Sequence, residues 1–284
     1  MKLAKFSVNG KITHGLVTET GVIDFSKIGL PYKDIQAIID AGDTALNTIK
    51  SMTVGLEPHY KLSEVTLLAP ISRPGKFLAI GMNYKKHEEE VEKSGIEKRS
   101  NQTWFNKQIT CINDPFGNIV PGVTEQLDYE VELGLIIGKK SKYLTKENVR
   151  DAIFGYLVVN DVSARDWQFH TPTFTMGKSF DTHGPIGPWI VTADEIENPQ
   201  NLDIRCYVNG ELRQSNNTAE MIYSINDQLI YLSKAFTLEP GDLIATGTPE
   251  GVGLALEPQI FLQPGDIVKC EVQHVGVIEN RVVA

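Results

Sequence analysis

Apolar and polar positions alternate over much of this chain, and short turns interrupt the alternation. Residues 2–26 alternate and contain the pair Asn9-Gly10, which predicts a β-hairpin followed by a further strand. Residues 34–52 instead place isoleucine and leucine three or four positions apart, which predicts helix. Together these patterns predict a small α/β domain over residues 1–70. Two prolines and a glycine in residues 69–76 mark the predicted boundary.

Strand patterns outnumber helix patterns in the second predicted domain, residues 71–284. Asn209-Gly210 lies between two alternating segments and predicts another hairpin. The pattern L-x-P-G-D occurs at 238–242 and 262–266, and each copy predicts a Pro-Gly turn that leads into a strand. The expected fold class is therefore α+β and dominated by β-structure. Helical spacing in this domain is predicted at about residues 84–94, 145–154 and 219–235.

Composition narrows the possible partners and the compartment. The chain has 284 residues, of which 41% are hydrophobic and 22% charged, as in ordinary soluble globular proteins. Its net charge of −9 argues against a nucleic-acid or anionic-membrane partner. The cysteines are few and widely spaced, which argues against a disulfide scaffold or zinc ribbon and favours a reducing compartment. We find no signal-peptide pattern and no apolar run long enough to span a membrane, so we expect a cytoplasmic protein.

One apolar segment, residues 127–140, carries a line of acidic residues. Asp128, Glu130 and Glu132 alternate with apolar neighbours, so we expect their carboxylates to point to one face of a strand. The apolar run 133–137 follows without alternation, which indicates burial on both faces. Two carboxylates about 7 Å apart repel by about 2.4 kcal/mol at an effective dielectric of about 20. A buried pair therefore needs protons, cationic partners or a metal ion, whereas a solvated strand face would need none.

A further acid, Asp161, follows directly after the apolar segment 156–159 and Asn160. An acid at a strand exit, close to Glu130 and Glu132 on another strand, would complete a site made only of oxygen ligands. Such ligands select Mg²⁺, Mn²⁺ or Ca²⁺ over zinc. The sequence therefore makes these three carboxylates candidate metal ligands.

Three other motifs have both a chemical and a simpler interpretation. His87 and Glu90 are three positions apart on one face of a predicted helix and could form a general base, or an ordinary surface pair. Lys178 lies in a loop rich in glycine and proline and is either positioned for chemistry or solvated. Residues 246–253 could bind a carboxylate through backbone N–H groups, or form a simple turn. Residues 87–91 lack the second histidine of a zinc-protease motif, and Pro172 excludes a P-loop before Lys178.

Six segments, taken together and in order, resemble the fumarylacetoacetate hydrolase family. The resemblance covers roughly residues 70–284, and the N-terminal region contributes little to it. The segments are GMNYKKHEEE (81–90), DYEVELGLIIGKK (128–140), NDVSARDWQ (160–168), GKSFDTHGPIGP (177–188), NGELRQSNNTAEMI (209–222) and TGTPEGVG (246–253).

The resemblance implies a fold and a set of site residues. It implies a mixed β-sandwich roll with a metal at its open end, in a protein that is usually a homodimer. The implied metal ligands are Glu130, Glu132 and Asp161. The implied site residues are the His87–Glu90 pair on a lid, Lys178 at a substrate oxygen, Gln168 near the pair, Thr248 at the substrate carboxylate, and Lys107 and Arg165 as further contacts. The charged and polar segment 88–105 is either this lid or a plain solvated helix and loop. Met82 stands where some members have a basic residue, which leaves the preference at the distal end of the substrate open.

The implied substrate is a small 2-oxo acid, and the implied cofactor is Mg²⁺, with Mn²⁺ or Ca²⁺ as substitutes. Hydrolysis of the C–C bond of acylpyruvates through a pyruvate enolate is the expected reaction, with His87 activating water. Decarboxylation or keto–enol tautomerisation of oxaloacetate, and isomerisation of hydroxylated dienedioates, are the alternatives. A metal-stabilised binding protein without turnover is the alternative of another class.

Overall fold

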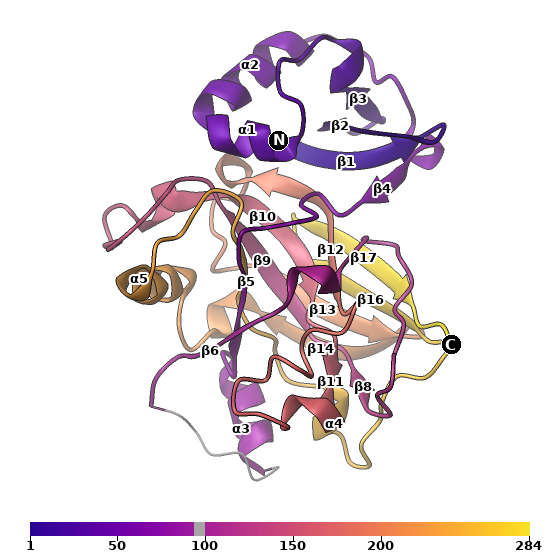
Figure 1. Ribbon diagram of the computed structural model, residues 1–284, viewed down its shortest axis with the longest axis vertical. Helices are drawn as coiled ribbons and strands as arrows, with labels where there is room; N and C mark the ends of the chain where they lie inside the picture. The colour runs from indigo at the N-terminus through magenta and orange to yellow at the C-terminus, as the bar shows by residue number, and fades with distance from the viewer. Residues whose placement is uncertain (94–99) are drawn as a thin grey trace.

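The computed structural model describes residues 1–93 and 100–284 (Figure 1). The α-helices are α1 (Ile35–Ala41), α2 (Asp43–Thr53), α3 (Lys85–Lys93), α4 (Arg165–Gln168) and α5 (Ile225–Ala235). The strands of the first half are β1 (Lys2–Val8), β2 (Lys11–Val17), β3 (Val22–Asp24), β4 (Thr66–Leu68), β5 (Phe77–Gly81), β6 (Thr103–Asn106), β7 (Ile112–Asn113), β8 (Leu127–Asp128) and β9 (Val131–Ile137). Those of the second half are β10 (Ile153–Asn160), β11 (Ser163–Ala164), β12 (Gly184–Thr192), β13 (Asp203–Val208), β14 (Glu211–Asn217), β15 (Leu243–Ala245), β16 (Ile267–Val272) and β17 (Gly276–Arg281).

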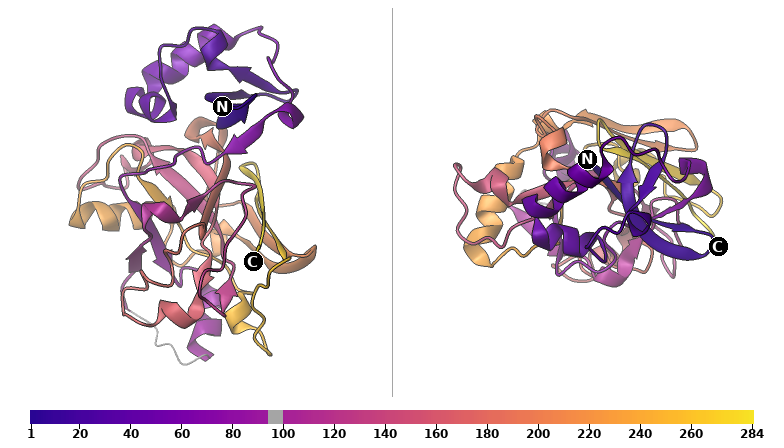
Figure 2. Two further views of the ribbon diagram at one scale, coloured as in Figure 1. Left: turned by 45° about the vertical axis from the view of Figure 1, so that its right-hand side comes forward. Right: turned by 90° about the horizontal axis from the view of Figure 1, so that it is seen from above.

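Two sheets dominate the described residues. The larger has eleven strands with the main order β3-β2-β1-β12-β10-β9-β15-β5-β6, and the smaller has the order β14-β13-β16-β17. The smaller sheet packs against β9, β10 and β12 of the larger one, and its yellow C-terminal strand lies at the right in Figure 1 and in the left view of Figure 2. This sheet-dominated α+β architecture confirms the predicted fold class. None of the described helices is long and apolar enough to cross a membrane.

The central strands β9 and β10 place the acidic residues. Every residue of both strands is buried, as the apolar run predicts. They pair antiparallel, with Glu132 opposite Val159 and Val131 opposite Asn160. The start of β9 and the end of β10 therefore lie side by side, and this brings Glu130 and Asp161 together.

The N-terminal region lies at one end of the molecule (Figure 1), and its strands β1, β2 and β3 extend the large sheet. Strand β1 pairs with β12 through Lys2↔Val191 and Leu3↔Ile190. The predicted hairpin at Asn9-Gly10 is confirmed, with both residues at positive φ, where this pair is favoured in tight hairpin turns. The division of the chain at residue 70 stays a prediction.

Three helix predictions need correction. Residues 34–52 form two helices rather than one, because Gly42 takes φ 54° and ends α1. The helix predicted at 145–154 is wrong: a 3₁₀ turn at Val149–Ala152 leads into β10, whose apolar residues fill a buried strand. The helix predicted at 219–235 begins only at Ile225, where Ser224 and Asp227 form a capping box.

The two other predicted turns and the helix predicted at 84–94 are found. The Asn209-Gly210 hairpin joins β13 and β14, and both Pro-Gly turns precede strands, with Gly241 and Gly265 at positive φ. The helix predicted at 84–94 is observed as α3. Residues 94–99 of the candidate lid lie outside the described residues.

Candidate metal and active site

Glu130, Glu132 and Asp161 meet at the junction of β9 and β10. One carboxylate oxygen of each lies within 4.8 Å of the others, and all three side chains are buried. The backbone N–H of Asp161 donates to Glu130 O at 2.8 Å, and the N–H of Glu130 donates to Asn160 Oδ1 at 3.1 Å. These bonds fix the two strand ends against each other, so the acids predicted from separate segments form one cluster.

Three buried cationic side chains surround these acids. Lys178 Nζ lies 2.7 Å from Glu130 Oε2 and 2.8 Å from Asp161 Oδ2. Lys107 Nζ lies 2.6 Å from the other oxygen of Asp161. Arg165 Nη2 lies 2.7 Å from Glu130 Oε1. Lysine and arginine therefore compensate part of the negative charge of the triad, as an ionised buried carboxylate requires.

Asp128 does not join the triad, which corrects the prediction that it points with Glu130 and Glu132. The segment breaks into β8 and β9 on either side of residues 129–130, and the strand alternation is lost there. The Asp128 carboxylate instead accepts from Arg165 Nε at 2.8 Å and from the N–H groups of Gly253 and Leu254 at 2.8 and 3.0 Å.

Glu132 is the acid of this cluster that the described cations leave without an ion pair. Its Oε2 accepts the N–H of Gly247 at 2.6 Å, and its side chain is buried. Burial and the nearby Asp161 and Glu130 carboxylates raise the pKa of Glu132 well above its usual range. A divalent cation between the three acids would satisfy this carboxylate, so the residues fit a metal with oxygen ligands.

Glu130 and Lys178 show the opposite behaviour because they are paired. Burial alone would raise the pKa of Glu130, but Lys178 and Arg165 outweigh it and lower the pKa to about 2. Burial alone would lower the pKa of Lys178, but Asp161 and Glu130 raise it. Both groups are therefore charged at neutral pH.

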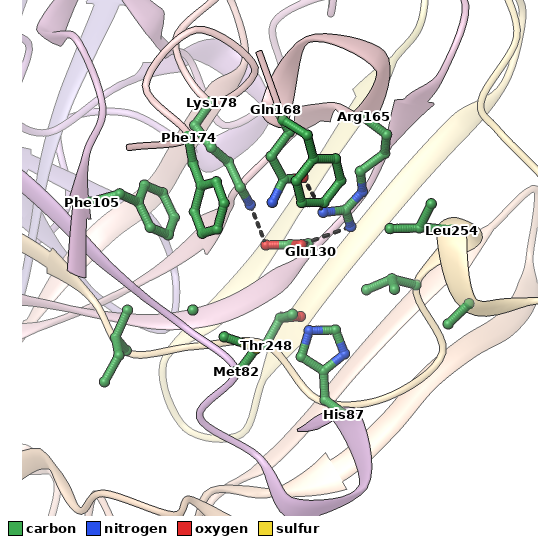
Figure 3. A pocket seen from close by; sticks show the side chains of 15 residues that line it. Met82, His87, Phe105, Glu130, Arg165, Gln168, Phe174, Lys178, Thr248 and Leu254 are labelled. Atoms are coloured by element: carbon green, nitrogen blue, oxygen red, sulfur yellow. Dashed lines mark hydrogen bonds and ion pairs between the residues drawn. The ribbon is translucent and has the colours of Figure 1, made fainter. Parts of the chain in front are cut away.

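A cavity opens beside the triad, and most of the predicted site residues line it (Figure 3). His87 lies across the cavity from Lys178 and Gln168. Its Nδ1 is 3.6 Å from Glu90 Oε2, so the pair predicted on one helix face does meet. Glu90 also accepts the N–H of Gly251 at 3.1 Å, which connects α3 to the segment 246–253.

Gln168 and Thr248 line the same cavity but differ in free hydrogen-bonding capacity. Gln168 Oε1 accepts from Arg165 Nη1 at 2.8 Å, and because arginine only donates, the Gln168 amide nitrogen is left to face the cavity. The Thr248 hydroxyl donates to Val131 O at 2.9 Å and accepts from Gln214 Nε2 at 2.8 Å. Its single proton is therefore engaged in the protein, and the contact to a substrate carboxylate that the resemblance implies stays a prediction.

Lys107 donates a hydrogen bond to Asp161 but is not one of the residues that line the cavity.

The sequence did not single out the apolar part of the cavity wall. Ile80, Phe105, Phe169, Phe174, Val252, Leu254 and Ala255 line it together with Met82. They come from separate segments, and in the sequence each resembles an ordinary core residue. Val252 lies inside the segment 246–253 that the sequence analysis singled out, so its place at the site could have been predicted from that segment.

A family model agrees with this geometry. The model described as fumarylacetoacetate (FAA) hydrolase C-terminal matches residues 76–283. The chain belongs to the fumarylacetoacetate hydrolase family. The matched range contains both β9 and β10 and every residue of the candidate site.

Relatives within this family carry out more than one reaction. The chain is 40% identical over 267 residues to "Oxaloacetate tautomerase Fahd2a, mitochondrial" of Rattus norvegicus, which covers 93% of this chain and 84% of the relative. A maleylpyruvate hydrolase from Sphingobium sp. SYK-6, solved in complex with manganese(II) ion and pyruvate, aligns with TM-score 0.82 at 30% identity over 100% of this chain and 99% of that one. A 2-hydroxyhepta-2,4-diene-1,7-dioate isomerase from Mycobacterium marinum aligns with TM-score 0.75 at 28% identity over 100% and 98%. These relatives are enzymes, and the maleylpyruvate hydrolase was solved with a manganese ion.

Proposed function

We propose that this protein is a Mg²⁺-dependent enzyme that hydrolyses the C–C bond of acylpyruvates, a class of β-diketo acids. The observation that carries the proposal is that one cavity is lined both by Glu130 of the candidate metal triad and by His87 of the His–Glu pair. A binding protein stabilised by a cation would need the triad alone, so the His87–Glu90 pair favours turnover.

The triad would hold the cation, for which Mg²⁺ is our proposal and Mn²⁺ or Ca²⁺ are the substitutes. When bound, the cation would supply Lewis-acid stabilisation of negative charge on the C2 oxygen of a 2-oxo acid. Lys178 Nζ lies among the same oxygens and would place a second positive charge beside that oxygen. The Gln168 amide nitrogen would donate to a substrate oxygen from the cavity wall.

His87 would act as the general base toward the attacking water. Its Nδ1 faces Glu90, so Nε2 is the ring nitrogen left to accept a proton in the cavity. Glu90 is held by the Gly251 N–H and would orient the imidazole. The proton taken from water would then be available to the pyruvate carbon that leaves.

Keto–enol tautomerisation of oxaloacetate is the second candidate, and the rat relative of 40% identity favours it. This reaction moves a proton between C3 and the C2 oxygen and needs no attacking water. Decarboxylation of oxaloacetate and isomerisation of dienedioates would use the same charge stabilisation. The bond that changes therefore depends on groups beyond the triad.

The test compares His87→Asn with the wild type on acetylpyruvate and on oxaloacetate. We expect pyruvate release from acetylpyruvate to fall by about 10²–10⁴-fold, the usual contribution of a general base. His274→Asn, in the exposed turn between β16 and β17, is the matched control and should keep full activity. If His87→Asn hydrolysed acetylpyruvate at the wild-type rate, the water-activating role would be refuted. If the wild type tautomerised oxaloacetate and left acetylpyruvate intact, the second candidate would replace the first.

Two further parts of the proposal concern the whole protein. We propose a homodimer, which the family resemblance implies, and light scattering at several protein concentrations would measure the mass. We also propose a cytoplasmic location, whereas the rat relative is named as mitochondrial. Microscopy of the tagged chain in its native cell would separate the two compartments.

A further inference from the structure

The segment 209–222 is part of the family resemblance, yet none of the described residues that line the cavity comes from it. Its residues 211–217 form β14, an edge strand of the smaller sheet. The structure describes every residue of β14, and among them Gln214 alone is buried, with 0% of its surface exposed. A polar side chain buried in an otherwise exposed strand needs hydrogen-bond partners within the protein, and those partners indicate its role.

Both ends of the Gln214 amide are bonded to parts of the candidate site. Its Oε1 accepts the N–H of Val131, the residue between the two glutamates of the triad, at 3.0 Å. Its Nε2 donates to Thr248 Oγ1 and to Pro249 O, each at 2.8 Å. The carbonyl oxygen and both amide protons are thus in use, and the side chain joins the metal-binding strand to the segment 246–253.

These bonds form a closed ring with Thr248, which lines the cavity (Figure 3). The Thr248 hydroxyl donates to Val131 O at 2.9 Å, so Gln214 and Thr248 hold both backbone polar groups of Val131. The residue before Thr248, Gly247, donates its N–H to Glu132 Oε2 at 2.6 Å. Gln214 therefore restrains Glu132 from two directions, through its neighbour in β9 and through the turn that contains Gly247.

Other residues of β14 support the same segment. Asn216 Nδ2 donates to Glu250 Oε2 at 2.7 Å. A Cβ at Gly251 would lie 2.1 Å from Arg213 O, so the two backbones are in close contact there. The Gly251 N–H in turn donates to Glu90, which faces the candidate general base. The smaller sheet thus holds a segment that contacts both the triad and the His–Glu pair.

We propose that Gln214 is a positioning residue, which holds Thr248 and the backbone beside Glu132 in place for the metal and the substrate. This inference rests on the proposed function, because it assumes that the triad holds a divalent cation. Gln214 does not itself line the cavity, so its effect would reach the ligands through hydrogen bonds. Partners of this kind contribute about 10–100-fold to metal affinity or activity.

Gln214→Met tests the role, because methionine has a similar length and shape and cannot make these hydrogen bonds. We expect calorimetric titration without substrate to show Mn²⁺ binding about 10–100-fold weaker than in the wild type. Gln273→Met is the matched control. Gln273 Oε1 also accepts a backbone N–H, that of Asp203 at 3.1 Å, but Gln273 is not one of the described cavity-lining residues. The control should bind Mn²⁺ as the wild type does.

A double-mutant cycle separates positioning from a general loss of stability. Thr248→Val removes the hydroxyl that Gln214 contacts, so Gln214→Met should weaken Mn²⁺ binding by a smaller factor in that background than in the wild type. Gln273→Met should have no effect in either background. Equal losses from Gln214→Met in both backgrounds would show that Gln214 acts independently of this ring, and would overturn the inference.

Melting curves establish whether each variant folds. Gln214→Asn is the second variant, for use if Gln214→Met does not fold: its amide is one methylene shorter and cannot reach all three partners at once. It should also bind Mn²⁺ more weakly than the wild type. Wild-type Mn²⁺ affinity in the folded variant would overturn the inference. Failure of both variants to fold would overturn it too, since Gln214 would then be required for the fold itself.

The inference and the proposed function fail in different ways. If the wild type binds Mn²⁺ and hydrolyses acetylpyruvate, and Gln214→Met does both equally well, only the inference falls. If the wild type binds no divalent cation and turns over no 2-oxo acid, the proposed function falls and the inference falls with it.

Discussion

At the scale of single residues, the surroundings of Glu132 indicate a metal site rather than a purely structural network of ion pairs. Glu130 and Asp161 have lysine or arginine partners, and their charges are compensated without an ion. Glu132 has one N–H donor and two acidic neighbours. Much of the free energy of ion binding should therefore come from compensating the negative charge of the Glu132 carboxylate.

Glu132→Gln should stabilise the metal-free protein and abolish its response to Mg²⁺. Because the folded-state pKa of Glu132 is raised, its protonation stabilises the fold at low pH, and that stabilisation is lost as pH rises through the raised pKa. The gain in melting temperature from the neutral amide should therefore grow with pH, to roughly 2–4 °C for about 1 kcal/mol in a chain of this size. Melting curves with EDTA and with Mg²⁺, at several pH values, measure both effects.

Glu279→Gln, on the exposed face of β17, is the matched control and should change neither quantity. If the Glu132→Gln protein melted at a lower temperature than the wild type at neutral pH in EDTA, the raised pKa assigned to Glu132 would be contradicted. A wild type whose melting temperature ignored Mg²⁺, Mn²⁺ and Ca²⁺ would contradict the metal site.

At the scale of elements, the candidate site depends on how closely α4 packs against the loop before Lys178. A Cβ at Gly177 would lie 2.3 Å from Gln168 N and 2.5 Å from Ala164 O, both backbone atoms. Glycine is therefore required here for close approach. The contact sets the position of Arg165 and Gln168, on α4, relative to Lys178.

Gly177→Ala should impair activity more than stability. Separating α4 from the loop would cost about 1–3 kcal/mol and displace the cationic groups, and misplacement of about 1 Å can lower the rate about 10²-fold. Activity assays together with melting curves would show the two effects. Gly210→Ala is the control: nothing lies within 4 Å of its Cβ, and its φ of 81° imposes strain far from the cavity. If both variants lost activity equally, the packing explanation would fail.

The same scale shows how far sequence could go. The triad was predictable because acids at a strand start and a strand exit interrupt two apolar runs, and antiparallel pairing of β9 with β10 does bring them together. The strand that begins at Ile153 could not be told from a helix, because a short apolar segment suits a buried strand as well as a helix. The cavity wall was not predictable because Ile80, Phe105 and Leu254 are far apart in sequence and only tertiary packing joins them.

At the scale of the whole molecule, the N-terminal region shares a hydrophobic core with the large sheet. One buried cluster contains Leu3, Ile38 and Ile49 from this region together with Ile136 and Phe154 from β9 and β10. The N-terminal amine adds a hydrogen bond to Thr192 Oγ1 and an ion pair with Glu195. The N-terminal region thus packs at the end of the central strands that lies away from the acids.

Removal of residues 1–70 should therefore destabilise the remainder rather than leave an active domain. Residues 71–284 alone would expose the apolar side chains of β9, β10 and β12 that now pack in the shared core. We expect increased binding of a hydrophobic dye and loss of a cooperative melting transition, measured against the full chain. A truncated protein that melted cooperatively and kept acetylpyruvate hydrolysis would show instead that the catalytic part folds by itself.

The lysine and arginine partners of Glu130 and Asp161 have a practical consequence for spectroscopy. Because these carboxylates are neutralised before any ion arrives, we expect the fold to survive chelation, so that purified protein can be emptied and refilled at will. Manganese, which is paramagnetic, could then be introduced as a reporter. Its resonance spectrum would change when a ligand replaces coordinated water, giving a direct view of substrate approach.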